Sequence, residues 1–373
     1  MMLLTYMPGQ EEIKYWLSMA KIPGLGPVRL KRIWEHFDSM KRAWEADLEN
    51  LRGAGLEQKI AEEIVFLRQR INPDEEFLNA QKEGINIVTL ADKSYPKLLK
   101  EIYGPPAILY YKGELFGEGD EFAVAMVGTR KYSSYGKLVA MNIASELSNQ
   151  GITTVSGLAI GIDGLVHEAT VNQKARTIAV LGSGIDETSI YPSANRYLAK
   201  KIIENNGLLL AEYPPGTIPN KQNFPQRNRI IAGLSVATVV IEAPETSGAL
   251  LTAKHALEQN RDVMAVPGNI YSQNAAGPNN LIKMGAKLVT SASDVLEALN
   301  MKQVKDFIDN RKISPDTKEE AIILDILSNE PTHIDELIKK SGMNTATINS
   351  TLILMEMKGK VRNLGNMMYI ASR

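Results

Sequence analysis

The sequence predicts an α/β protein with a Rossmann-like, doubly wound and mostly parallel sheet, flanked by a helical domain before it and a winged helix after it. Two observations predict the sheet: short apolar runs recur between residues 123 and 266, and helical segments separate them. Continuous apolar strands that alternate with helices indicate a parallel sheet covered on both faces. A change of pattern before residue 73 and after residue 299 indicates the flanking domains.

The first expected domain, residues 1–72, consists of short helices with two glycine-rich turns, at 22–27 and 51–56. These turns resemble the hairpins of a helix-hairpin-helix or SAM-like unit, in which glycine lets backbone N–H groups approach a phosphate at a helix N-terminus. A tight helix–helix turn without a ligand explains the same residues, because the local charge is close to zero. Pro73 and the acidic residues that follow it suggest the boundary.

The central domain is expected over residues 73–299. Its strands are predicted from apolar runs at 123–127, 152–155, 177–181, 208–211, 236–241 and 263–266. Its helices are predicted at 138–147, 166–174, 197–204 and 249–259. In such sheets, ligands bind beyond the carboxyl ends of the strands. The residues that follow each strand are therefore the candidate site.

Small residues and arginines follow these strands. Arginine is costly to hold beside a core unless its guanidinium meets an anion. Taken alone, Arg227 and Arg229 fit structural ion pairs as well as a phosphate site. The convergence of the strand ends favours phosphate, although Lys174 and Arg176 precede their strand and start at its far end. The candidate phosphate-binding residues are Gly128, Thr129, Arg130, Ser156, Gly157, Lys174, Arg176, Arg227, Asn228, Arg229, Ser247, Gly248 and Lys254.

Candidates for catalysis are few. Asp163 and His167 stand four residues apart on a predicted helix and could share acid–base work or a metal, but a helix cap and a packed histidine explain them better. Glu212 and Glu242 each end a strand and could form a carboxylate pair, or could hold loop N–H groups and arginines. The glycine patterns match neither a dinucleotide fingerprint nor a Walker loop. We expect no catalytic residue, no metal site and no cofactor.

The last part of the chain divides into a linker, 300–315, and a winged helix-turn-helix domain, 316–373. Three amphipathic helices and a short hairpin predict the latter. Its expected reading helix has no Arg or Lys before Lys358, so it cannot neutralise many phosphates. A protein-contact or regulatory role for this domain is therefore as consistent with the sequence as DNA reading. The polar residues of this helix are Asn344, Thr345, Thr347, Asn349 and Ser350.

Composition limits the partners. The 373 residues contain 42 basic and 43 acidic side chains, so the formal charge is −1, and no expected domain is broadly basic. Binding to nucleic acid would have to come from a local cluster of placed cations. No apolar run is long enough for a bilayer, residues 1–10 lack the features of a secretory signal, and there is no cysteine. These observations predict a cytoplasmic protein without membrane contact.

Read in order, the motifs of the central domain closely resemble those of the DprA/Smf family of bacterial DNA-processing proteins. The residues that carry the resemblance are 127–130, 156–163 with His167, 177–184, 191–192, 224–229, 247–253 and 266–268. The winged helix fits the family as well. The resemblance implies a non-catalytic protein that binds single-stranded DNA at the Rossmann-like domain, chiefly through Gly128, Arg130, Ser156, Gly157, Arg227, Asn228 and Arg229.

The resemblance further implies protection of incoming DNA and loading of the RecA recombinase during natural transformation, by a homodimer formed through the Rossmann-like domain. The alternative is a nucleotide-binding or nucleoside-monophosphate-hydrolysing protein of related fold. Such hydrolases have a Pro-Gly-Gly-x-Gly-Thr loop that leads to a catalytic glutamate. The matching turn here, 244–250, lacks that pair of glycines.

Overall fold

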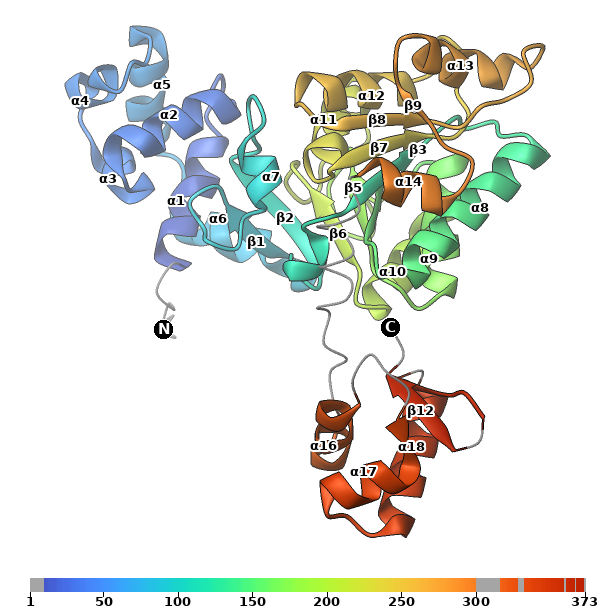
Figure 1. Ribbon diagram of the computed structural model, residues 1–373. Coiled ribbons are helices and arrows are strands. Elements are labelled where there is room, and N and C mark those ends of the chain that lie inside the picture. Colours follow the sequence, from blue (N-terminus) through green and yellow to red (C-terminus); the bar gives the residue numbers. More distant parts are fainter. Residues whose placement is uncertain (1–9, 300–315, 328–331, 359, 366, 372–373) are drawn as a thin grey trace. The chain divides into compact units, whose positions relative to one another are not determined.

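The computed structural model describes residues 10–299, 316–327, 332–358, 360–365 and 367–371 (Figure 1). The chain forms two compact units, Met1–Leu299 and Asn300–Arg373. The linker expected at 300–315 lies outside the described residues. Within those residues, no helix is both long and apolar enough to cross a bilayer.

Six helices open the first unit. They are α1 Gln10–Ala20, α2 Pro27–Phe37, α3 Met40–Glu45, α4 Leu48–Gly53, α5 Gln58–Leu67 and α6 Pro73–Ala80. Gly24 and Gly55, in the two glycine-rich turns, have φ angles of +83° and +76°, which glycine adopts without strain. Nη1 of Arg29 donates to the Gly24 carbonyl at 2.8 Å, and Nη1 of Arg32 donates to the Gly55 carbonyl at 3.0 Å. Two arginines of α2 therefore hold the turns themselves.

A nine-stranded sheet follows, with the strand order β1-β2-β6-β5-β4-β3-β7-β8-β9. The strands are β1 Asn86–Thr89, β2 Ile108–Gly113, β3 Val124–Val127, β4 Thr154–Ser156, β5 Thr177–Leu181, β6 Leu208–Ala211, β7 Ala237–Val240, β8 Asp262–Ala265 and β9 Lys287–Leu288. β2 pairs antiparallel with both β1 and β6, and the remaining neighbours are parallel. This arrangement confirms the predicted Rossmann-like, mostly parallel sheet. The sequence analysis had not predicted β1, β2 or β9.

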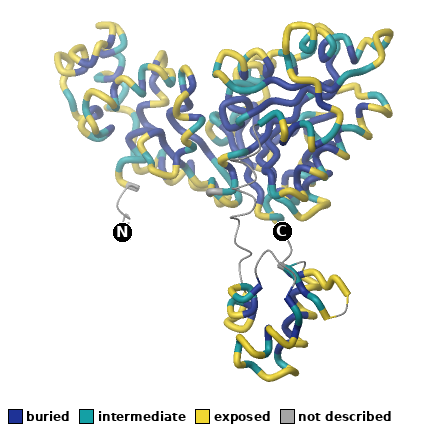
Figure 2. Tube along the Cα trace, in the orientation of Figure 1, coloured by how far each residue is buried: buried dark blue, intermediate teal, exposed yellow. Residues whose placement is uncertain are grey.

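Helices cover both faces of the sheet (Figure 1). On one face lie α8 Ser134–Asn149, α9 Ile162–Asn172 and α10 Arg196–Glu204, and on the other lie α11 Asn223–Gly233 and α12 Ala249–Glu258. Every residue of β3, β5, β6 and β7 is buried as a result (Figure 2). That double burial explains why these strands are continuous apolar runs. Smaller elements complete the unit: α7 Lys97–Lys100, α13 Ala276–Lys283, α14 Ala292–Ala298, and the 3₁₀ turns Lys82–Gly84, Glu118–Asp120, Ser193–Asn195 and Gln273–Ala275.

The helical region and the sheet share one hydrophobic core. Trp16 and Ile33 from the helices belong to the same buried cluster as Leu109 and Leu209 from the sheet. α6 packs against α1, and α1 also contacts β1. Packing is therefore continuous across residue 72, where the sequence suggested a domain boundary.

The second unit is a winged helix, as predicted. It contains α16 Lys318–Ile326, β10 Thr332–His333, α17 Ile334–Ser341, α18 Thr345–Met357, β11 Val361–Asn363 and β12 Met368–Ala371. The strands form a sheet of their own in the order β10-β12-β11. Ile323, Leu337, Ile348 and Leu352 are among the residues of its separate core. The short strand β10 was not predicted from the sequence.

Candidate nucleic-acid interface

The carboxyl ends of β3 and β7 border a cavity of about 930 Å³, here called the rim cavity. Gly128 follows β3, Ser247 lies in the loop after β7, and Arg227 and Asn228 of α11 close a further side. The two strands pair in register, with Val127 opposite Val240, so the residues that follow them share one edge. β3 has β4 on one side and β7 on the other, which makes this the point where the strand order reverses. Ligands of doubly wound sheets bind at such points.

The rim cavity brings together part of the predicted set. Its lining includes Gly128, Thr129, Arg130, Arg227, Asn228, Ser247 and Gly248. Among the described residues that line it are also two lysines that the sequence analysis missed, Lys131 and Lys221. Lys131 directly follows Arg130, and Lys221 lies three residues before Phe224. This closeness to predicted motifs is the feature of the sequence that could have indicated both lysines.

Exposed cations surround the mouth of the rim cavity. Arg130, Lys131 and Lys221 are all exposed, whereas Asp163, the one acid in the described lining, is buried. The guanidinium carbon of Arg130 lies 5.7 Å from the centroid of the Phe224 ring, and this contact steadies the side chain without neutralising it. The mouth therefore carries local positive charge on a protein that is nearly neutral overall.

Beneath the mouth, the buried Asp163 carboxylate and Arg227 guanidinium tie the strand-end loops together. Nη1 of Arg227 donates to the Gly157 carbonyl at 2.7 Å and also to the Val180 carbonyl. Oδ2 of Asp163 accepts from the Gly157 N–H at 3.2 Å. Burial raises the pKa of Asp163, while Arg227 and backbone N–H groups oppose that rise. Burial likewise lowers the pKa of Arg227 to about 10, so the guanidinium keeps its proton at neutral pH.

Two glycines at the rim allow neighbouring side chains to pack closely against the backbone. A Cβ on Gly157 would lie 2.5 Å from Nη2 of Arg227 and 2.7 Å from Oδ2 of Asp163. A Cβ on Gly128 would lie 2.5 Å from Cγ1 of Ile162. Glycine at the rim was expected to leave room for a ligand, but at these two positions the protein's own atoms fill the space.

The N-terminus of α12 borders the rim cavity. Oγ of Ser247 accepts from the Ala249 N–H at 3.3 Å, and the next two N–H groups of the helix donate to the carbonyls of Ser247 and Gly248. Its N-cap, Gly248, makes no side-chain cap, and a Cβ there would meet nothing within 4 Å. Nδ2 of Asn228 donates to the Gly248 carbonyl at 3.2 Å and fixes the turn from the side. What this helix start presents to an anion is the positive end of the helix dipole.

Three other predicted residues lie near the rim but have partners within the protein. Ser156 is buried, and its Oγ donates to the Met126 carbonyl at 2.7 Å. Nη2 of Arg229 lies 2.5 and 2.7 Å from the two carboxylate oxygens of Glu212, the ion pair that sequence reasoning had kept as an alternative. Lys254 lies on α12 outside the cavity lining, 3.7 Å from Glu258.

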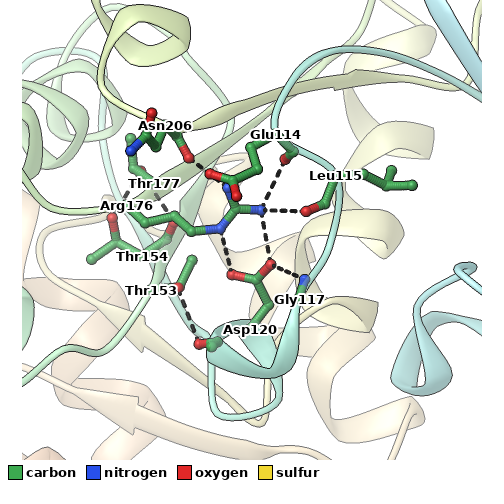
Figure 3. Close-up of polar contacts among 10 residues, drawn as sticks. Glu114, Leu115, Gly117, Asp120, Thr153, Thr154, Arg176, Thr177 and Asn206 are labelled. Carbon is green, nitrogen blue, oxygen red and sulfur yellow. Dashed lines mark hydrogen bonds and ion pairs between the residues drawn. The ribbon is translucent and has the colours of Figure 1, made fainter. Parts of the chain in front are cut away.

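Lys174 and Arg176 do not border the rim. They precede β5 and so lie at its amino end, opposite to the rim. Arg176 donates from Nε to Oδ1 of Asp120 at 2.8 Å and from Nη2 to Oδ2 at 2.9 Å (Figure 3). It also donates to the carbonyls of Asn206 and Glu114. Arg176 is therefore a clamp between the starts of two strands and the loop after β2.

The candidate catalytic groups have structural partners. Nδ1 of His167 lies 2.7 Å from Oγ1 of Thr177, and burial lowers the pKa of His167 to about 3, which keeps it neutral. Glu242 accepts from the N–H of Ser133 at 2.9 Å and from its Oγ at 2.5 Å, so it caps the start of α8. Among the described residues, no three His, Cys, Asp or Glu side chains gather as a metal site would require.

Comparison with protein families gives two matches. Residues 86–300 match the family of DNA recombination-mediator protein A, and residues 309–367 match the DprA winged helix domain. Protein Smf of Synechocystis is 36% identical over 96% of this chain and 98% of its own length. DNA processing protein DprA of Bacillus subtilis is 44% identical over 60% of this chain and 75% of its own length.

Solved structures agree with these matches. DprA from Streptococcus pneumoniae is 36% identical, with a TM-score of 0.67 over 76% of this chain and 97% of its own. DNA processing protein A from Helicobacter pylori, whose single-stranded DNA binding mode was studied, is 26% identical, with a TM-score of 0.52 over 59% of this chain and 98% of its own. From its motifs, its fold and these relatives, the chain belongs to the DprA/Smf family of DNA-processing proteins.

Proposed function

We propose that this protein binds single-stranded DNA at the rim cavity, without catalysing a reaction on it. The observation that carries the proposal is the group of three exposed cations, Arg130, Lys131 and Lys221, around a cavity whose one acid among the described lining residues is buried. Strand phosphates bind such guanidinium groups and backbone N–H groups, while the bases can stack on aromatic rings. Phe224 and Tyr191, with ring centroids 5.8 Å apart, offer such rings beside the cations.

Replacing Arg130 with alanine tests this site. A charge-assisted hydrogen bond to phosphate is worth roughly 1.5–3 kcal/mol, so affinity for a fluorescent single strand should fall about 10- to 100-fold. The slope of log K against log salt should also drop by about 0.7, the contribution of one phosphate contact to a single strand. Titration of single-stranded and duplex DNA over a series of salt concentrations measures both quantities.

The matched control is Arg70→Ala, which removes an exposed arginine of the helical region that stacks on Phe66 and lies outside the rim cavity. It should bind strands as the wild type does. Equal binding by Arg130→Ala, with an unchanged melting curve, would remove Arg130 from the site. Weak wild-type binding to both DNA forms would favour a small nucleotide as ligand, and release of base from nucleoside monophosphates would then be the assay.

The biological role that we propose is protection of incoming single strands and loading of RecA onto them during natural transformation, in the cytoplasm. Strand binding without strand chemistry is sufficient for both tasks. RecA-dependent ATP hydrolysis on strands precoated with a single-strand-binding protein measures loading. Acceleration by the wild type but not by Arg130→Ala is the expected result.

We also propose that the protein forms a homodimer through the Rossmann-like domain. The short strand β9 ends the sheet, and large apolar side chains around it are exposed, including Ile270, Tyr271, Met284 and Leu288. Exposed apolar groups of this size are typical of protein interfaces. Sedimentation analysis of wild type and Met284→Asp compares the two masses, and a monomeric wild type contradicts the proposal.

Deleting residues 316–373 should leave strand affinity within about twofold, because α18, the expected reading helix, has no Lys or Arg to neutralise phosphates. That unit has its own core, so the remaining chain keeps the whole sheet and the rim cavity. Fluorescence titration of the truncated protein against the full chain measures the effect. A large loss of affinity would move the principal strand site into the winged helix.

A further inference from the structure

A second cavity lies on the other side of α11 from the rim cavity. It measures about 650 Å³ and is here called the junction pocket, because it lies where α1, α2 and α6 meet the end of β6. Its walls are largely apolar, with Leu17, Ala20 and Val28 from the helices and Ala107 and Ile108 from the start of β2. A concave apolar site of this size is typical of small-ligand binding.

The charges of the junction pocket cancel. Its charged lining residues are Lys21, Glu76, Glu212 and Arg229. Nζ of Lys21 lies 2.5 Å from the Glu76 carboxylate, and Nη2 of Arg229 lies 2.5 Å from that of Glu212. In contrast to the rim cavity, the described lining of this pocket has no unpaired cation that could hold a phosphate, so the pocket favours an uncharged group.

The side chains that line the junction pocket indicate the shape and polarity of the group that would fit it. Tyr213, Pro214 and Pro215 supply flat faces at the end of β6, and Tyr103 supplies a further ring that is 90% exposed. Gln226 and Asn79 place amides at the edge of the pocket, and Asn79 makes no side-chain hydrogen bond with the described residues. An amide both donates and accepts. Stacking surfaces with amides at their edge suit a flat heterocycle such as a nucleobase.

One helix forms a wall of both cavities. Gln226 and Arg229 of α11 line the junction pocket, whereas Arg227, Asn228 and Ile231 line the rim cavity. Gln226 and Arg229 are three residues apart, and Ile231 is three and four residues from Asn228 and Arg227, so each set has the spacing of one helix face. The two cavities are thus separated by about the diameter of one helix, roughly 10 Å.

We infer that the junction pocket binds a nucleobase, supplied by the strand whose phosphates lie at the rim cavity. This inference rests on the proposed function for the source of the base. The chemistry of the pocket would equally accept a base from a free nucleoside, and the experiment separates these sources. The phosphates stay at the charged rim and the unstacked base enters the neutral pocket.

The test uses Ala20→Trp, which fills the pocket from an exposed position at the end of α1. Leu78→Trp is the matched control, since Leu78 is exposed on α6 but lies outside the pocket lining. Asn79→Leu is a second variant that removes only the amide. The probes are 2-aminopurine deoxyriboside and oligo(dT) strands that carry one 2-aminopurine at successive positions, with fluorescence as readout.

The expected result is a position-specific fluorescence change in the strand, lost in Ala20→Trp and kept in Leu78→Trp. Strand affinity should fall about tenfold in Ala20→Trp, the effect of losing one stacked base. Asn79→Leu should reduce the position-specific signal. Binding of the free nucleoside, blocked by Ala20→Trp, supports the same pocket with a free ligand as its source.

A wild type that binds strands in an Arg130-dependent manner, with no position-specific signal and no nucleoside binding, would overturn the inference and leave the proposed function intact. A wild type that binds the nucleoside but no strand would sink the proposed function instead. An apolar peptide that protects the pocket against labelling at Ala20→Cys, while 2-aminopurine does not, would also overturn the inference.

Discussion

Replacing Arg227 with alanine should lower the free energy of unfolding by about 3–5 kcal/mol, because each buried polar group left without its partner costs about 1–3 kcal/mol. Its side chain is only 4% exposed, and its loss leaves the Gly157 and Val180 carbonyls without their donor. Asp163 would also remain buried without its counter-charge. Urea denaturation followed by circular dichroism measures the change.

The same substitution should reduce strand binding even at temperatures where the variant is folded, because Arg227 holds the loops that carry the rim. Arg130→Ala provides the contrast, since it removes an exposed cation and should leave the melting curve unchanged. Adding Asp163→Asn to Arg227→Ala should recover part of the lost stability by removing the unpaired negative charge. An Arg227→Ala protein as stable as the wild type would show that the hydrogen bonds of Arg227 do not support the rim.

Replacing Arg176 with alanine should also destabilise the fold, by about 3 kcal/mol, but without a selective loss of strand binding. Arg176 and Asp120 are largely buried, with side chains 14% and 7% exposed, and Asp120 would lose both of its bonds to the guanidinium. Thermal and urea denaturation measure the loss. Strand affinity, measured where the variant is folded, should match that of the wild type because Arg176 lies at the amino end of β5.

Lys174→Ala is the control for this prediction. Lys174 lies two residues away, is exposed, and should change stability by no more than about 0.5 kcal/mol. If Arg176→Ala stayed fully stable yet bound strands weakly, the clamp would not be its role, and the arginine would return to the list of strand contacts.

The sheet was predictable because its central strands are buried on both faces. Residues 177–181 were predicted as a strand and form β5 with the same bounds. The strands that were missed lie toward the ends of the sheets or are very short: β1 and β2 are antiparallel, and β9 and β10 have two residues each. Such segments carry too few residues or too little alternation to stand out from loops.

The position of the candidate site at the strand ends could be predicted from the sequence. Which side chains line the cavity there could not. Arg227 and Arg229 stand two positions apart in one motif, yet one ties the strand-end loops and the other pairs with Glu212 beside a different cavity. Which face of α11 meets which cavity depends on tertiary packing that sequence spacing does not contain. Lys131 and Lys221 escaped notice because both lie in irregular segments, where no periodicity marks the exposed side.

The buried bonds of Asp163 and Arg227 have a consequence for the thermodynamics of association. Because the loops are tied to one another, we expect the rim to keep its geometry when a ligand binds. A preorganised receptor loses little conformational entropy on binding. If the rim binds a strand as proposed, nearly all of the entropy loss on binding falls on the strand. A stiff, self-stacked strand and a flexible one should then differ in affinity through their own entropy rather than through their contacts with the protein.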